Sequence, residues 1–118
     1  MKNFLAIYLG TEAAVERSGW TKLSDEQRRA REQEGMAAWM NWAKANAASI
    51  VDHGAPLGKT KRASAEGLGD VKNAMAGYVI VRAESHDAAA KLFANHPHFT
   101  VFPGESVEIM ECLPMPGA

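Results

Sequence analysis

The stretch from Gly77 to Pro97 constrains the fold of this 118-residue chain most tightly. It begins with GYVIVRA, which is apolar on both alternating faces near Gly77, as expected for a strand that is covered on both sides. Ser85 then precedes a short alanine-rich helix and can accept a hydrogen bond from its first turn. Pro97 lacks an N–H, so we expect this helix to end near Asn95. A second strand follows at Ser106–Glu111, which completes a strand–helix–strand unit.

The first half of the chain repeats this order of elements. Asn3–Leu9 is apolar on both faces and is expected to be a central strand. Ser24 and Gln27 match a capping box, so a long helix should run from about Ser24 to Asn46. A strand is expected within Ala48–Pro56. Together the two halves predict one α+β domain over residues 1–118 with a ferredoxin-like βαββαβ order.

The long helix is expected to pack through one apolar stripe, from which Trp42 is displaced. Gly35 lies within this helix and should weaken it by roughly 1 kcal/mol relative to alanine. The expected stripe consists of Met36, Trp39, Met40, Ala43 and Ala47.

Two segments show no strong periodicity. Lys59–Ala76 is polar and contains two glycines, which leaves a flexible connection or a β-hairpin tip as alternatives. The tail Leu113–Ala118 has two prolines and a glycine and is expected to be irregular.

Composition narrows the classes of partner. The net charge is −1, which gives no general electrostatic argument for binding nucleic acid or a membrane surface. No apolar run approaches the ~20 residues that span a bilayer, and the N-terminal MKNFLAIYLG indicates a first strand rather than a signal peptide. The single cysteine, Cys112, excludes an internal disulfide and is expected to be a buried packing thiol in a cytoplasmic protein.

Several short motifs resemble the YCII-related family, close to its DGPF-domain branch. They are Gly54–Leu57, Gly77–Ala83, Ser85 with Asp87–Ala89, His96-Pro97 and Gly104–Ile109. The resemblance implies a dimeric α+β barrel, in which the sheets of two copies face each other and enclose a cavity.

The resemblance also draws attention to two missing residues. Members of this family often carry a histidine–aspartate pair that is proposed to be catalytic. The histidine would fall near Gly35–Ala37, where this chain has none, and the aspartate would stand where this chain has His96. Both departures count against a transfer of that catalytic role.

The candidate catalytic residues are His53, Asp52 and Asp70. His53 follows Asp52 at the end of a predicted strand, and a histidine pKa suits acid–base chemistry. The alternative is a hydrogen-bonded histidine with a structural role. Asp70 is a further acid–base candidate in the polar segment.

The candidate ligand-binding residues are Tyr78, Arg82, Glu84 and Trp39. Arg82 and Glu84 share a strand face with Tyr78 and would hold a small polar ligand if that face lines the cavity of the dimer. A cross-strand salt bridge is the alternative for the two charges, and core packing is the alternative for Trp39.

His96-Pro97-His98 could present two imidazoles to one metal ion, with His53 joining them. However, no cysteine or carboxylate lies beside the pair at ligand spacing, and histidines are common in surface turns. We therefore expect no metal site and no cofactor.

Two functions from different classes remain open. The first is a homodimeric protein that binds a small molecule in a cavity near the dimer interface. The second is a small cofactor-independent enzyme of lyase, isomerase or hydrolase type, using His53 with Asp52, Arg82 or Asp70. A partner-binding accessory subunit is a third option, which would require a large exposed apolar patch.

Overall fold

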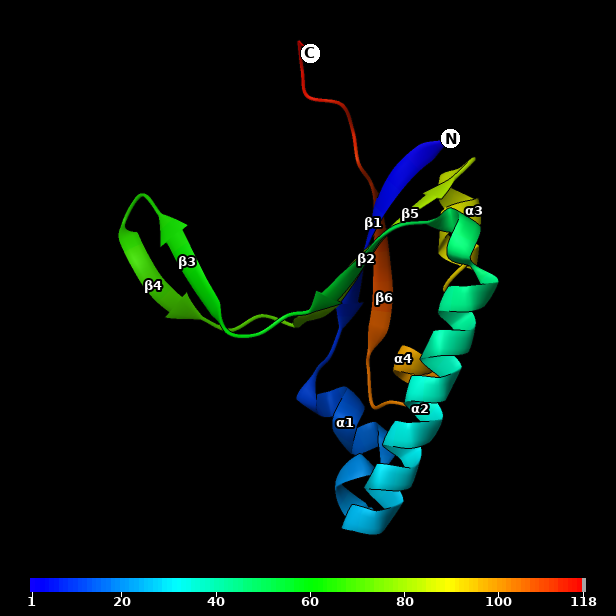
Figure 1. The fold of residues 1–118 in the computed structure, drawn as a ribbon. Helices are drawn as coiled ribbons and strands as arrows, with labels where there is room; N and C mark the ends of the chain where they lie inside the picture. Colours follow the sequence, from blue (N-terminus) through cyan, green and yellow to red (C-terminus); the bar gives the residue numbers. More distant parts are fainter. Residues whose placement is uncertain (118) are drawn as a thin grey trace.

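The computed structural model describes residues 1–117 and has a mixed α+β architecture with two antiparallel sheets (Figure 1). Four strands form the main sheet in the order β2-β5-β1-β6, and every neighbouring pair is antiparallel. The bounds of these strands are Lys2–Leu9 (β1), Ile50–Pro56 (β2), Met75–Ala83 (β5) and Ser106–Glu111 (β6). The strands lie within two residues of their sequence-based bounds where those were given.

The helices of the described chain lie in two connections, one between β1 and β2 and the other between β5 and β6. The α-helices are α1 (Glu12–Ser18), α2 (Asp25–Ala45), α3 (His86–Lys91) and α4 (Pro97–Thr100), with short 3-10 helices η1 (Trp20–Lys22) and η2 (Ala47–Ser49). The capping box of Ser24 and Gln27 and the Ser85 cap are confirmed. Helix α3 ends earlier than Asn95, and Asn95 itself has a positive φ of 56° before the α4 turn. No helix among residues 1–117 has the length and apolar character needed to cross a membrane.

The core lies between the main sheet and the helices α2, α3 and α4, which occupy one side of the sheet (Figure 1). On β1 the side chains of Phe4, Ala6 and Tyr8 are buried on this side. In the register they lie opposite Val81, Val79 and Gly77 of β5. Phe4 is fully buried, and burial of one such side chain stabilises a fold by about 1.5–3 kcal/mol.

The opposite face of the sheet is apolar but only partly buried. Leu5 and Ile7 of β1 lie opposite Ile80 and Tyr78 of β5 on this face, and all four side chains have intermediate exposure. Met110 of β6 is 42% exposed beside Leu5. Strand β1 is therefore central, as expected, but only its helix-facing side is fully covered within a single chain.

Helix α2 packs through a face that is rotated from the expected stripe. Gly35 is buried, and Trp39, Trp42 and Ala43 are half-buried, whereas Met36 and Met40 are more than half exposed. Trp42 lies off the expected stripe but on the observed packing face, where its indole Nε1 donates a hydrogen bond to the Leu92 carbonyl at 2.7 Å.

Gly35 allows the Phe102 ring to pack directly against α2. A Cβ atom at this position would lie 2.4 Å from the Phe102 ring, so only glycine lets the helix and the ring approach this closely. The intrinsic cost of glycine in a helix is thus accompanied by a close packing contact.

Most of the segment Lys59–Ala76 forms a hairpin rather than a flexible connection, and its last two residues begin β5. Its strands are β3 (Thr60–Ser64) and β4 (Gly67–Val71), and almost all of their residues are exposed. The hairpin projects away from the main sheet (Figure 1).

The C-terminal segment differs from expectation at one residue. Cys112 is exposed rather than buried, because β6 ends at Glu111 and the chain then leaves the sheet. Residues 113–117 form no helix or strand, as expected, and Ala118 lies outside the described residues.

Candidate functional site: an aromatic cavity beside the sheet

A cavity of about 370 Å³ lies where β2 ends and β5 begins, and α2 and the α4 segment complete its wall. This volume falls within the range of small-molecule sites, roughly 300–1,000 Å³. The larger residues that line it are Tyr8, Met36, Trp39, His53, His98 and Phe102, and Tyr78 lines it at the β5 edge. Among the described residues that line it, none is Asp, Glu, Lys or Arg.

A break in the β2 register forms the rim of the cavity. The pairing of β2 with β5 shifts between Asp52 and Ala55, and Gly54 at this shift has a φ of 66°. A Cβ atom on Gly54 would lie 1.8 Å from the Tyr78 carbonyl oxygen, so the bulge requires glycine. The Asp52 carboxylate accepts a hydrogen bond from the Gly54 N–H at 2.8 Å. The bulge places His53, which is exposed, among the residues that line the cavity.

The inner wall is built from aromatic rings. The centroids of Tyr8 and Trp39 are 4.8 Å apart, and those of Trp39 and Phe102 are 6.1 Å apart at 64°. Trp39 also meets the His96 ring edge-on, at 4.5 Å and 88°. Tilted and edge-to-face contacts of this kind favour a defined ring arrangement, so the wall offers a shaped apolar surface.

His96 lies behind this wall and is completely buried. Its Nδ1 accepts a hydrogen bond from the His98 N–H at 3.0 Å, which caps α4. In the neutral ring the proton must then be on Nε2, which lies 3.4 Å from the Tyr8 hydroxyl. Burial, together with the nearby His98, lowers the pKa of His96 to about 4, so the ring is neutral at pH 7.

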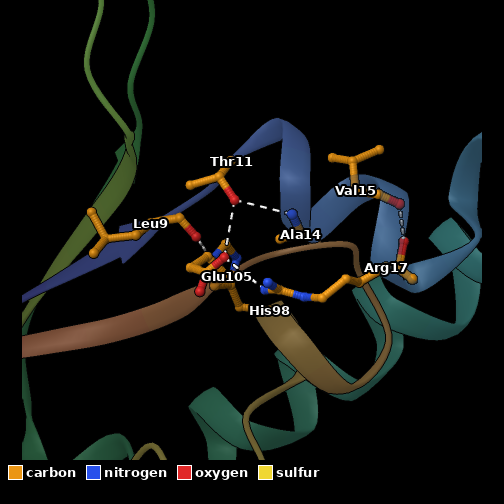
Figure 2. Close-up of polar contacts among 8 residues, drawn as sticks. Leu9, Thr11, Ala14, Val15, Arg17, His98 and Glu105 are labelled. Carbon is orange, nitrogen blue, oxygen red and sulfur yellow. Dashed lines mark hydrogen bonds and ion pairs between the residues drawn. The ribbon is translucent and has the colours of Figure 1, made fainter.

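His98 lines the cavity and is fixed by a backbone carbonyl. Its Nε2 lies 2.7 Å from the Leu9 oxygen (Figure 2), and because a carbonyl only accepts, Nε2 carries the proton. Gly104 permits this position, since a Cβ atom there would lie 2.4 Å from the imidazole Nε2. Burial lowers the pKa of His98, and the hydrogen bond to Leu9 partly opposes that shift.

A polar cluster holds the loop after α4 against the beginning of α1 (Figure 2). Thr11 Oγ1 and Arg17 Nη2 each donate to the Glu105 carboxylate at 2.9 Å. The Glu105 N–H in turn donates to the Leu9 carbonyl at 2.9 Å, the same oxygen that His98 uses. The hydrogen bond from Thr11, followed by the bond from Arg17 and its charge, lowers the pKa of Glu105. The cluster therefore helps to fix the carbonyl that orients His98.

Three of the expected site residues meet at the cavity, namely Trp39, His53 and Tyr78. The other four do not line it. Asp52 holds the Gly54 bulge, and Asp70 lies on the hairpin, where it forms a 2.7 Å ion pair with Lys61. Arg82 and Glu84 are exposed at the far end of β5 and just beyond it.

The expectation of a surface turn at His96-Pro97-His98 is wrong, because both imidazoles are buried. The sequence did carry a partial signal, since a proline after a histidine at the start of a helical turn is compatible with a capping role. Nothing in the sequence indicated that Trp39 and Trp42 of α2 pack against the ring of His96. Among residues 1–117, no group of three or more His, Cys, Asp or Glu side chains is arranged to hold a metal ion.

Comparisons with known proteins identify a fold but not a family. No family model matches the chain, and no curated protein matches it in sequence. In structure it is similar to 5-chloro-2-hydroxyhydroquinone dehydrochlorinase from Burkholderia phenoliruptrix AC1100, solved in complex with 2,5-dihydroxybenzoquinone. The TM-score is 0.55 and the identity 15%, over 94% of this chain and 93% of that chain. At this identity the likeness shows the shared α+β fold alone.

Proposed function

We propose that this protein binds a small, flat, uncharged molecule of about one ring in the cavity beside the sheet. The observation that carries the proposal is the lining itself, which combines aromatic rings and two imidazoles and, within residues 1–117, includes no side chain of Asp, Glu, Lys or Arg. Such walls favour a planar apolar body, and a few polar groups orient it.

The ligand contacts proposed from the sequence fit this site in part. Trp39 offers a ring surface, and β5 at Tyr78 and β2 at His53 form the edge of the cavity across from it. His53 lies at the exposed rim, where it would contact a polar substituent that faces solvent.

The fold likeness supports this class of ligand. The similar structure from Burkholderia holds 2,5-dihydroxybenzoquinone, which is a single substituted ring. The order β2-β5-β1-β6 also agrees with a ferredoxin-like βαββαβ topology and with membership of the YCII-related family.

We further propose that the protein is a homodimer that buries the open face of the sheet. Leu5, Ile7, Tyr78 and Ile80 form a continuous apolar surface there, which one chain leaves partly exposed. A second sheet packed on this face would cover it and bring Arg82 and Glu84 of each copy toward the interface.

A cofactor-independent enzyme is the second candidate, because a neutral histidine lines the cavity. From the sequence, this hypothesis assigns proton transfer to His53 with Asp52, Arg82 or Asp70. In the structure, however, the Asp52 carboxylate bonds to Gly54 and Asp70 pairs with Lys61.

Calorimetric titration with 4-nitroanisole and 4-nitrobenzoate tests the binding proposal. The two probes have similar rings, but only the second is anionic at pH 7. We expect saturable binding of 4-nitroanisole and at least tenfold weaker binding of 4-nitrobenzoate, because no Lys or Arg among the described residues lines the cavity to pair with a carboxylate.

Two matched variants locate the binding site. Met36→Trp enlarges a side chain of α2 that lines the cavity and should strongly weaken the binding of 4-nitroanisole, whereas Ala63→Trp, on exposed β3, should leave it unchanged. Absence of any binding, or equal binding to both variants, would overturn the proposal.

A further inference from the structure

The hydrogen bonds around Tyr8 leave its hydroxyl proton free. His96 Nδ1 is occupied by the His98 N–H, so the His96 proton is on Nε2 and points to the Tyr8 oxygen at 3.4 Å. The tyrosine oxygen thus accepts one bond from behind the wall. Because Tyr8 also lines the cavity, its own O–H remains available to donate to a bound molecule.

His98 offers a hydrogen-bond acceptor, whereas Tyr8 offers a donor. Its Nε2–H donates to the Leu9 carbonyl, which leaves an unshared electron pair on Nδ1. Among residues 1–117, no buried side-chain nitrogen or oxygen lacks a hydrogen-bond partner. A side-chain nitrogen without a partner must therefore be accessible rather than buried. His98 Nδ1 has no hydrogen-bond partner in the described chain, so it is accessible, and His98 is one of the residues that line the cavity.

The surroundings of His98 favour its neutral form in the free protein. The ionisable groups near it are Tyr8 of β1 and His96 at the start of α4, both neutral at pH 7. The Glu105 carboxylate is directed at Thr11 and Arg17 instead. From α2 the neighbouring ring is that of Trp39, 6.2 Å away, which is uncharged.

We propose that Tyr8 and His98 form a donor–acceptor pair that selects a planar ligand with an acidic hydroxyl group, of the phenol or enol type, and takes up its proton. The O–H bond of the ligand breaks, an N–H bond forms at His98 Nδ1, and the electron pair stays on the ligand oxygen. The Tyr8 hydroxyl then donates to this oxyanion. This inference rests on the proposed ligand-binding function and adds a substrate class and a general base that the sequence did not indicate.

The step has a physical driving force although burial lowers the pKa of His98. An imidazolium alone is disfavoured in this cavity, but the oxyanion formed beside it favours the charged ring. The pair is neutral overall, and the hydrogen bond from Tyr8 adds a charge-assisted contact. The bond from His98 to Leu9 is retained in both protonation states.

The test compares 4-nitrophenol with 4-nitroanisole, which has the same ring but no acidic proton. We expect 4-nitrophenol to bind the wild-type protein about tenfold more tightly, and its bound form to show the visible absorption of the phenolate at a pH where the free probe is mostly protonated. Tyr8→Phe, which removes only the hydroxyl, should weaken 4-nitrophenol about tenfold and weaken 4-nitroanisole less.

Imidazole nitrogen NMR shifts of the wild-type protein provide a second measurement, which needs no substitution of the buried His98. The free protein should show His98 protonated at Nε2 alone, and saturation with 4-nitrophenol should protonate Nδ1 as well. An Nδ1-protonated ring in the free protein would overturn the inference, and so would a bound probe that stays a phenol. In either case, binding of 4-nitroanisole would still support the proposed function. If neither probe binds, the proposed function and this inference both fail.

Discussion

At the scale of single residues, His96 connects the fold to the site. One ring nitrogen caps α4 and the other faces the Tyr8 hydroxyl, while Trp39 and Trp42 cover the ring. Because the His96 ring is buried in its neutral form, its protonation affects the stability of the fold. A histidine whose folded pKa is lowered binds a proton more readily in the unfolded chain, so acid favours unfolding.

We expect the free energy of unfolding to fall as the pH decreases from 6.5 to 4. The contribution of neutral His96 is fully present above its unfolded pKa of 6.5 and is lost progressively toward its folded pKa of about 4. The loss should be on the order of 2–3 kcal/mol. Urea unfolding at a series of pH values measures this slope.

The matched variants for this measurement are His96→Asn and His53→Asn. His96→Asn should be less stable at pH 7, because packing is lost, but its stability should depend less on pH over this range. His53→Asn changes an exposed residue and should retain the wild-type slope. An unchanged slope in His96→Asn would show that other groups cause the acid sensitivity.

Gly54 is a second residue on which the site depends. Gly54→Ala should destabilise the protein by about 2 kcal/mol or more and abolish 4-nitroanisole binding, because the new Cβ collides with the Tyr78 carbonyl and φ is positive. Gly67→Ala is the control, since Gly67 also has a positive φ but has open space around it. Chemical denaturation and calorimetry would compare the two, and equal effects would argue against the close approach at Gly54.

At the scale of elements, the sequence was sufficient wherever local chemistry decides the structure. Alternation identified β1 and β5, and the side chains of Ser24 and Ser85 marked the beginnings of α2 and α3. The packing face of α2 could not be predicted in this way. Methionine and tryptophan are both apolar, so the sequence pattern could not show that Phe102 fits against Gly35 and that Trp42 lies on the packing face.

The site was predictable only in part, for a related reason. Trp39, His53 and Tyr78 lie on elements that the sequence identified, so their meeting at one cavity followed from the fold. The roles of Tyr8, His96 and His98 depend on contacts between residues almost 90 positions apart, such as the bond of His98 to Leu9. No local pattern reports such contacts.

The β3–β4 hairpin should be dispensable for the fold of the single chain. Its strands pair with each other and are almost wholly exposed, and its ion pair of Lys61 with Asp70 is a surface pair worth at most about 1 kcal/mol. We expect replacement of Lys59–Lys72 by Asn-Gly to preserve thermal unfolding within a few degrees. It should also preserve 4-nitroanisole binding, since no residue of 59–72 is among those lining the cavity.

Loss of binding in this shortened variant would contradict that expectation. It would also revive Asp70 as a candidate for the site. A point variant, Asp70→Asn, distinguishes this role of Asp70 from a general effect of removing the hairpin.

At the scale of the whole molecule, one apolar face of the main sheet lacks a layer. The helices cover only one side, so the arrangement in Figure 1 is a two-layer structure with a partly exposed second face. A second copy would complete it without any change in the chain.

We expect sedimentation to show a dimer of the wild-type protein and a folded monomer of Ile80→Glu. The glutamate would place a charge at the centre of the proposed interface, whose burial unpaired is costly. Leu68→Glu, at an 87% exposed position on the hairpin, is the control and should remain dimeric. A monomeric wild-type protein at high concentration would contradict the dimeric barrel.

The most direct test of the account is a crystal structure of the protein with 4-nitroanisole. We expect the ring of the probe against Trp39, with its ether oxygen toward the Tyr8 hydroxyl and His53 at the rim. Density for the probe only on the open face of the sheet or on the hairpin, with the cavity beside Trp39 free of it, would contradict the central claim.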